Sequence, residues 1–289
     1  MSTEIEAFEQ DLNSSETGGD WVEALENYVD CLPGSIIEYL GLDETSFLIE
    51  RGRTLLVVLE TAEENLGSAS TGFPSGWKTA EENGWSYLGI ISLQGARNTY
   101  KEVSGYITQL VSEGAFKAFD EILFVGMKRS CKLALTCAGI VENSKVLLIQ
   151  PESSDSATGE FADGNPVQRA LVAYDPSKAE AIEFVNNTRA NETILLPCRH
   201  MGDRTAQFIK IFDLLPALFD MAFSEEPSRP AFFTQMRQQK RLHRAYWRGV
   251  LRKMDNVSKP KLSKMMCQSI QSTLGGRVFR RELRRIENL

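Results

Sequence analysis

One stretch in the middle of the chain, residues 121–151, restricts the possible fold more than any other part. An apolar run over residues 122–125 ends at Gly126, a helical pattern covers residues 129–140, and a second apolar run covers residues 146–149. Strand, tight turn, helix and strand in this order predict a right-handed crossover between parallel strands. Ligands of such sheets bind at the carboxyl ends of the strands, which here means residues 127–131.

Similar apolar runs recur along the chain, with helical patterns between them. The clearest cover residues 55–59, 170–174 and 193–197. This alternation predicts an α/β fold with a doubly wound, mostly parallel sheet. With 289 residues, of which 42% are hydrophobic, the chain can bury one large core and carry additions to it.

Composition divides the chain into three parts. Residues 1–19 are rich in Glu, Ser, Thr and Gly, so we expect a disordered acidic leader. Residues 20–230 are expected to form the α/β domain, whose first helix begins with Asp20 as its N-cap. Residues 231–289 are expected to form a basic helical extension, in which Met236, His243 and Trp247 share the apolar face of one helix.

The net charge of −7 hides a strong asymmetry between the two ends of the chain. From Arg237 onward there are 15 Lys and Arg against 3 Asp and Glu, a net charge of +12. The preceding residues contain 17 Lys and Arg and 36 Asp and Glu, a net charge of −19. Opposite charges of this kind attract each other within one chain, or allow a basic end to meet an acidic partner.

Targeting and metal-binding signals are missing from the sequence. No apolar run approaches the roughly 18 residues that span a bilayer, and the acidic start does not resemble a signal peptide, so we expect a cytoplasmic protein. The five cysteines are an odd number without a Cys-x-x-Cys pair, which favours neither a disulfide framework nor a zinc site. We therefore expect no metal and no cofactor.

Three predicted strand ends carry residues suited to chemistry. The first is the turn from Gly126 through Lys128 to Ser130, the second is Asp175, and the third is His200. This is the chain order of nucleophile, acid and histidine in the α/β-hydrolase superfamily, which the sequence resembles over residues 54–223. The resemblance implies a strand-to-helix elbow that presents the nucleophile.

Within that superfamily, the chain is most similar to uncharacterised bacterial hydrolase-like proteins with a basic helical tail. The resemblance rests on three segments: Gly-Trp-Ser-Tyr-Leu at residues 84–88, Tyr-Asp-Pro at residues 174–176, and Cys-Arg-His at residues 198–200.

The chain departs from the hydrolase pattern at the elbow itself. Lys128 occupies the position of the nucleophile, and Ser130 stands where a small glycine lets the turn close. The loop after Leu59 would supply an oxyanion donor, yet it begins with Glu60 and Thr61. The pattern therefore predicts a degenerate elbow at which Lys128, Arg129, Ser130, Glu60 and Thr61 bind a ligand.

Cys131 is the one alternative nucleophile. A thiol in the first turn of a helix, beside Lys128, Arg129 and Lys132, is expected to ionise more readily than usual. It could then act with His200 and Asp175. Equally, cysteine is commonly a small buried residue that packs in a core.

Three functions remain open from the sequence. The first is a degenerate hydrolase-like protein that binds a small anionic ligand or a protein partner without catalysis. The second is a thiol-dependent acyl hydrolase or transferase that uses Cys131, His200 and Asp175. The third is a scaffold or polyanion binder that acts through the basic tail, although nucleic acid is not favoured because a solvated helix face explains the same charges.

Overall fold

The computed structural model describes residues 2–65, 72–93, 99–152, 165–255 and 260–287. Within these residues, eight strands form a single sheet in the order β1-β2-β4-β3-β5-β6-β7-β8. Strands β1 and β2 run antiparallel to their neighbours, and the remaining pairs are parallel. The mostly parallel sheet predicted from the sequence is therefore confirmed. The strands are β1 Ser35–Tyr39, β2 Glu44–Ile49, β3 Thr54–Thr61, β4 Ser86–Ser92, β5 Glu121–Met127, β6 Lys145–Ile149, β7 Val167–Tyr174 and β8 Ala190–Pro197.

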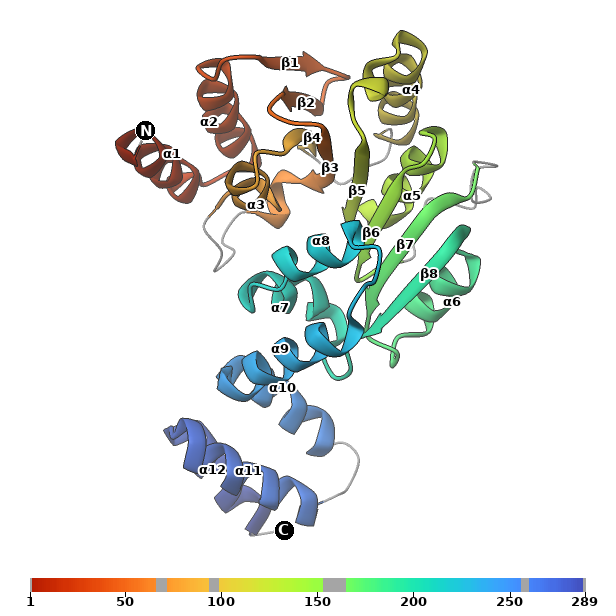
Figure 1. Cartoon of the computed structure of the whole chain (residues 1–289). Helices are drawn as coiled ribbons and strands as arrows, with labels where there is room; N and C mark the ends of the chain where they lie inside the picture. The colour runs from red at the N-terminus through yellow and green to blue at the C-terminus, as the bar shows by residue number, and fades with distance from the viewer. Residues whose placement is uncertain (1, 66–71, 94–98, 153–164, 256–259, 288–289) are drawn as a thin grey trace.

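Helices cover both faces of the sheet (Figure 1). One core contains buried side chains of α1, α2, α3, α7, α8 and α9, and the other contains those of α4, α5 and α6. The α-helices are α1 Ser2–Ser14, α2 Gly18–Asp30, α3 Trp77–Glu82, α4 Thr99–Glu113, α5 Ser130–Ile140, α6 Ala179–Asn187, α7 Thr205–Ile211, α8 Leu215–Phe223, α9 Arg229–Leu242, α10 Arg244–Asp255, α11 Pro260–Leu274 and α12 Arg277–Glu287. Short 3-10 helices are η1 Ala62–Glu64, η2 Ala115–Ala118 and η3 Gly202–Arg204.

The central strands are continuous apolar runs because both of their faces are covered. Along β3, Leu55, Val57 and Leu59 enter one core. Leu56 and Val58 enter the other, as the alternation of side chains along a strand requires. The same burial on both faces makes every residue of β6 buried.

The first residues of the chain form a helix, where a disordered leader was predicted. Phe8 and Leu12 of α1 are 3% and 2% exposed. The ring of Phe8 stacks on that of Tyr28 in α2, with 3.8 Å between centroids. Phe8 and Leu12, an i, i+4 apolar pair on one face of α1, provide burial that the composition of residues 1–19 did not suggest. The N-cap of α2 is Thr17 and not Asp20, which instead completes a capping box with Thr17.

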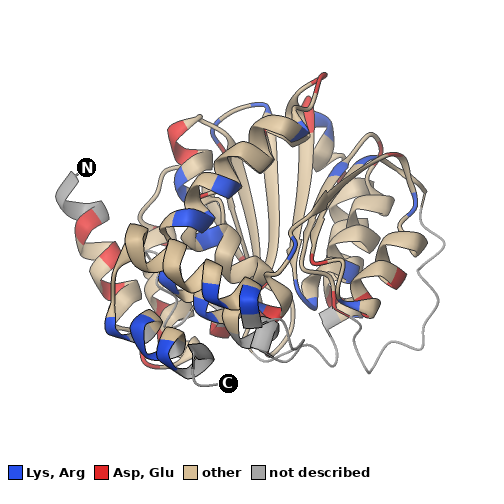
Figure 2. Cartoon of the chain, turned by 90° about the horizontal axis from the view of Figure 1, so that it is seen from below, with Lys and Arg blue, Asp and Glu red and all other residues tan. Residues whose placement is uncertain are grey.

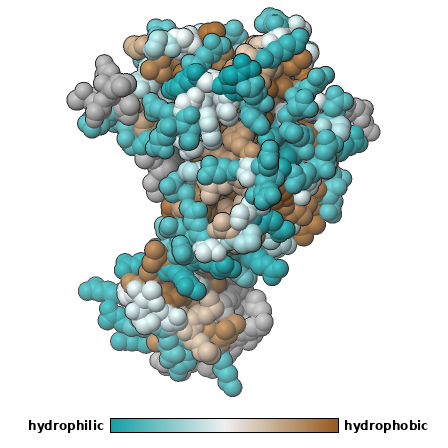
Figure 3. Space-filling view, in the orientation of Figure 1, coloured by the Kyte–Doolittle hydropathy of each residue, from teal (hydrophilic) through white to brown (hydrophobic). Residues whose placement is uncertain are grey.

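The basic tail is helical, but it is not one separate unit. The helix predicted through His243 breaks there into α9 and α10, and His243 has an extended backbone. Phe232 and Met236 of α9 and Val250 of α10 belong to the main core. Leu251 packs instead with α11 and α12 in a small core of their own, and the tail helices form a smaller lobe beneath the body (Figure 3).

Candidate functional site

The turn from β5 into α5 places Lys128 between the strand and the helix. Lys128 has a φ of 50°, in the left-handed region that non-glycine residues rarely adopt. Its N–H donates to the carbonyl of Ile149 at 2.9 Å, and its own carbonyl accepts from Cys131 N at 3.2 Å. A Cβ on Gly126 would lie only 2.7 Å from the carbonyl oxygen of Ser130, so the turn requires a glycine there.

Asp175 follows β7, and its carboxylate is held by backbone amides. The side chain is 3% exposed. Its oxygens accept hydrogen bonds from Ser177 N at 2.9 Å and from Gly202 N at 2.5 Å. Asp175 therefore fixes the loop after β8 to the loop after β7.

His200 follows β8, but its side chain is exposed. Its φ is 68°, and among the described residues no hydrogen bond or ion pair involves its imidazole. The structure thus places Asp175 and His200 at neighbouring strand ends without joining them as an acid and a histidine.

A lysine from the tail, Lys240, lies near the loops after β7 and β8. The sequence did not predict this position. Lys240 of α9 is 9% exposed, and its Nζ donates to the carbonyl oxygen of Arg199 at 2.9 Å. The ammonium also lies 5.0 Å from the ring centroid of Tyr246. Burial lowers the pKa of Lys240, and the nearby Cys198 and Asp175 oppose that shift. One sequence signal could have indicated this burial: Lys240 follows Met236 by four residues on an apolar helix face.

Cys131 lies inside the core on the α4–α6 face of the sheet. It is fully buried, and its thiol contacts the carbonyl oxygens of Gly126 at 3.3 Å and Ile149 at 3.5 Å. The loop that carries His200 contributes Cys198 and Met201 to the core on the opposite face. The structure does not bring Cys131 and His200 together.

Glu60 and Thr61 lie at the end of β3, where the preceding Leu59 pairs with Gly126 of β5. Glu60 is 2% exposed and accepts hydrogen bonds from the Ser75 amide at 3.0 Å and hydroxyl at 2.7 Å. Lys210 Nζ lies 3.8 Å from the same carboxylate and donates to Asn65 Oδ1 at 3.0 Å. Thr61 is half-buried and precedes η1. Glu60 therefore holds the Ser75 loop in place.

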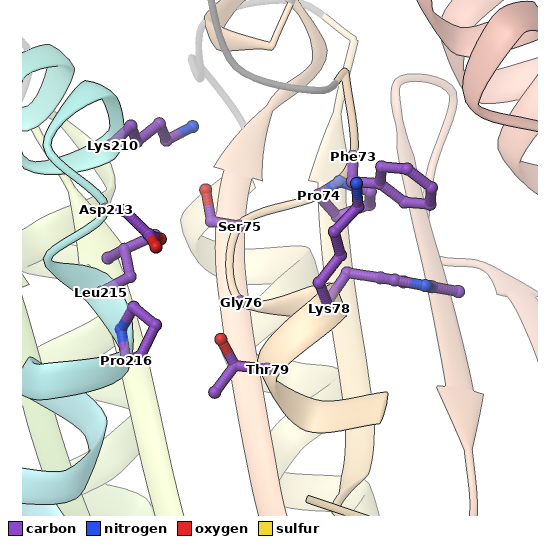
Figure 4. Close-up of a pocket in the computed structure, with 11 residues that line it drawn as sticks. Phe73, Pro74, Ser75, Gly76, Lys78, Thr79, Lys210, Asp213, Leu215 and Pro216 are labelled. Carbon is purple, nitrogen blue, oxygen red and sulfur yellow. The ribbon is translucent and has the colours of Figure 1, made fainter. Parts of the chain in front are cut away.

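A cavity of about 360 Å³ opens beside this loop (Figure 4). Ser75 connects it to the elbow, because the Ser75 hydroxyl lies 3.9 Å from the sulfur of Met127. Lys210 and Asp213 line one wall, and Ser75 and Thr79 line the opposite wall. In the described part of the chain, no cluster of His, Cys, Asp and Glu could hold a metal ion. Nor is any helix of that part both long and apolar enough to cross a membrane.

The strand order and the left-handed residue at the β5–α5 turn define an α/β-hydrolase fold. No protein-family model matches the sequence, and a search of curated proteins finds no match.

Solved structures of esterases are similar to the chain at low sequence identity. An esterase of the bacterial hormone-sensitive lipase family is 14% identical, with 83% of this chain and 98% of that chain covered and a TM-score of 0.44. A bacterial heroin esterase is 12% identical, with 77% and 93% covered and a TM-score of 0.45. Carboxyl esterase 2 from the mycorrhizal fungus Tuber melanosporum is 15% identical, with 72% and 87% covered and a TM-score of 0.42.

Proposed function

We propose that this protein uses the α/β-hydrolase fold to bind a small anionic ligand and does not hydrolyse esters. The observation that carries the proposal is the lysine at the tip of the elbow, where a hydrolase of this fold presents its nucleophile.

Several features support the absence of serine-type hydrolysis. That mechanism needs a hydroxyl at the tip, an imidazole that takes its proton, and an acid that orients the imidazole. An ammonium group has no lone pair with which to attack a carbonyl. Asp175 already accepts hydrogen bonds from two backbone amides, and His200 is exposed.

The surroundings of the elbow favour an anion. Lys128 and Arg129 are adjacent cations at the start of the 11-residue helix α5, whose N-terminal dipole end favours an anion. Arg129 is exposed, and Lys128 is half-buried. The cavity beside Ser75 leaves room for the rest of a small molecule.

Catalysis is tested with activated acetate and butyrate esters and with a thioester. We expect no turnover above the uncatalysed rate for the wild type, for Lys128→Ser or for His200→Ala. Turnover that His200→Ala abolishes would overturn the proposal. Turnover that both Cys131→Ala and His200→Ala abolish would establish the thiol-dependent acyl hydrolase or transferase, in spite of the buried position of Cys131.

Binding is tested by calorimetry with phosphate, acetate, succinate and adenosine monophosphate. We expect at least one of these anions to bind, and we expect Lys128→Ala or Arg129→Ala to weaken it by about tenfold or more, the value of a charged hydrogen bond. Lys101→Ala, which removes an exposed lysine of α4, is the matched control and should leave the affinity unchanged. Binding that all three variants retain would place the anion elsewhere.

A further inference from the structure

A groove lies between α1 and α2, far along the chain from the elbow. Its volume is about 630 Å³. The half-buried side chains of Tyr28 and Leu32 supply apolar surface to its lining, and the buried ring of Phe8 stacks on that of Tyr28. Carboxylates from three helices line it as well, so the groove combines aromatic surface with negative charge.

The carboxylates of this groove have few partners within the chain. Asp20 is committed to the capping box of α2, and its hydrogen bonds with Thr17 lower its pKa. Asp11 of α1, Glu23 of α2 and Glu81 of α3 form no ion pair with any described cation. Their negative charge is therefore not neutralised by the described part of the same chain.

Helix α12 carries exposed positive charges in place of negative ones. Arg277, Arg280, Arg281 and Arg284 follow one another at i, i+3, i+4 and i+7 and are all exposed. They lie opposite Phe279, which is 1% exposed and anchors the helix in the small tail core. None of these arginines pairs with a carboxylate among the described residues. We call these four residues the arginine face.

The groove and the arginine face do not meet within one molecule. Figure 1 places α1 and α2 at one end of the chain's fold and α11 and α12 at the other. Figure 2 shows the concentration of Lys and Arg on the tail helices. Each surface is thus exposed and lacks a partner of opposite charge at its own end.

We propose that the groove between α1 and α2 receives the arginine face of α12 from a second copy of this chain. A guanidinium packs against aromatic rings and pairs with carboxylates, and the groove offers the half-buried ring of Tyr28 and exposed carboxylates. Residues 277 and 284 are about 10 Å apart along the helix, so several arginines can reach the carboxylates of Asp11, Glu23 and Glu81 together.

The proposed contact joins two different surfaces, so it is heterologous. After one contact, one copy keeps an unused arginine face and the other keeps an unused groove, so association continues head to tail into chains or closes into a ring. Because exposed charges carry the contact, added salt weakens it: the screening length falls from about 10 Å at 0.1 M to about 3 Å at 1 M.

The test is sedimentation velocity of the full chain over a concentration series at low and high salt. We expect the wild type to form species larger than a monomer at low salt and to become monomeric at high salt. The groove variant Asp11→Lys/Glu23→Lys and the face variant Arg277→Glu/Arg281→Glu should each weaken association by about tenfold or more. The matched controls, Glu142→Lys and Arg237→Glu, change exposed charges outside both surfaces and should associate like the wild type.

Mixing the two impaired variants gives the sharpest result. The groove variant retains an intact arginine face, and the face variant retains an intact groove, so the mixture should associate more strongly than either variant alone. A chain that carries all four substitutions should associate with itself again. Circular dichroism establishes that each variant is folded.

Three results would overturn the proposal. The first is a wild type that stays monomeric at low salt and high concentration. The second is association that the groove variant leaves unchanged. The third is association that nuclease treatment removes, since the tail would then bind a polyanion and not a second copy.

Discussion

Lys128 is a non-glycine residue in a left-handed conformation at the β5–α5 turn. A left-handed conformation costs a non-glycine residue about 1–2 kcal/mol, which the surrounding turn must offset. We expect Lys128→Gly to raise the free energy of unfolding by about 1 kcal/mol, measured by urea denaturation. Arg129→Gly is the matched control, because Arg129 has right-handed helical angles and glycine there should destabilise the protein. A loss of stability in Lys128→Gly would contradict the strain argument.

Lys240 is expected to contribute to stability through its buried contacts. Lys240→Met removes the hydrogen bond to Arg199 and leaves the Asp175 carboxylate without this neighbouring charge. We expect the free energy of unfolding to fall by about 1–3 kcal/mol. The exposed Lys117→Met should change it little. A double-mutant cycle with Asp175→Asn should show coupling between the two positions, and strict additivity would refute their interaction.

At this scale, the sequence predicted positions better than contacts. Asp175 and His200 lie at strand ends as expected, because apolar runs followed by polar turns reveal where strands stop. What each side chain contacts could not be inferred. The partner of Lys240 is 41 residues away in sequence, and the atom it reaches is a backbone carbonyl that no residue type encodes. Glu60 likewise binds Ser75 across an intervening loop.

Among the elements, the packing of β5 against α5 depends on Gly126. An added Cβ would meet the Ala134 Cβ at 2.7 Å and the Cys131 Cα at 2.8 Å. We expect Gly126→Ala to cost about 1–3 kcal/mol or more, because strand and helix would have to separate. Gly105→Ala in α4 is the control: nothing lies within 4 Å of its added methyl group, so better helix propensity should stabilise the protein. Denaturant midpoints of the two variants should therefore move in opposite directions.

The junction between α9 and α10 is expected to be sensitive to acid. His243 packs edge-on against Phe212, with 5.2 Å between centroids. Burial, and to a smaller extent the positive charge of Arg204, lowers the pKa of His243. Below about pH 6.5 the unfolded chain gains a proton at this residue before the folded chain does, so stability falls as the pH decreases. His243→Gln should reduce the loss of stability between about pH 7.5 and about pH 5.5. An unchanged pH profile would show that other groups dominate.

Elements were predicted where their pattern is local and were missed where it depends on a distant partner. The strands β3, β5, β6, β7 and β8 are apolar runs that any sheet with two covered faces requires. The helix α1 was missed because Phe8 and Leu12 are too few to predict burial until Tyr28 and the core beside it are known. The break at His243 was missed because His243 itself continues the apolar spacing.

For the whole molecule, the tail packs in two cores: α9 and Val250 of α10 belong to the main core, and Leu251 packs with α11 and α12. We expect a chain that lacks residues 260–289 to keep a cooperative thermal transition near that of the wild type, because the main core loses little. A chain that ends before Arg229 loses Phe232, Met236 and Val250 from that core and should lose its cooperative transition. Circular dichroism melting compares the two, and a cooperative transition in both would favour the boundary predicted at residue 231.

The contact between Lys240 and Arg199 also sets an order of events during synthesis. The ribosome adds about 5–20 residues per second, so the 41 residues that separate the two positions take about 2–8 s to make. Small domains commonly fold faster than this. The body of the nascent chain can therefore fold before Lys240 is available to make this contact.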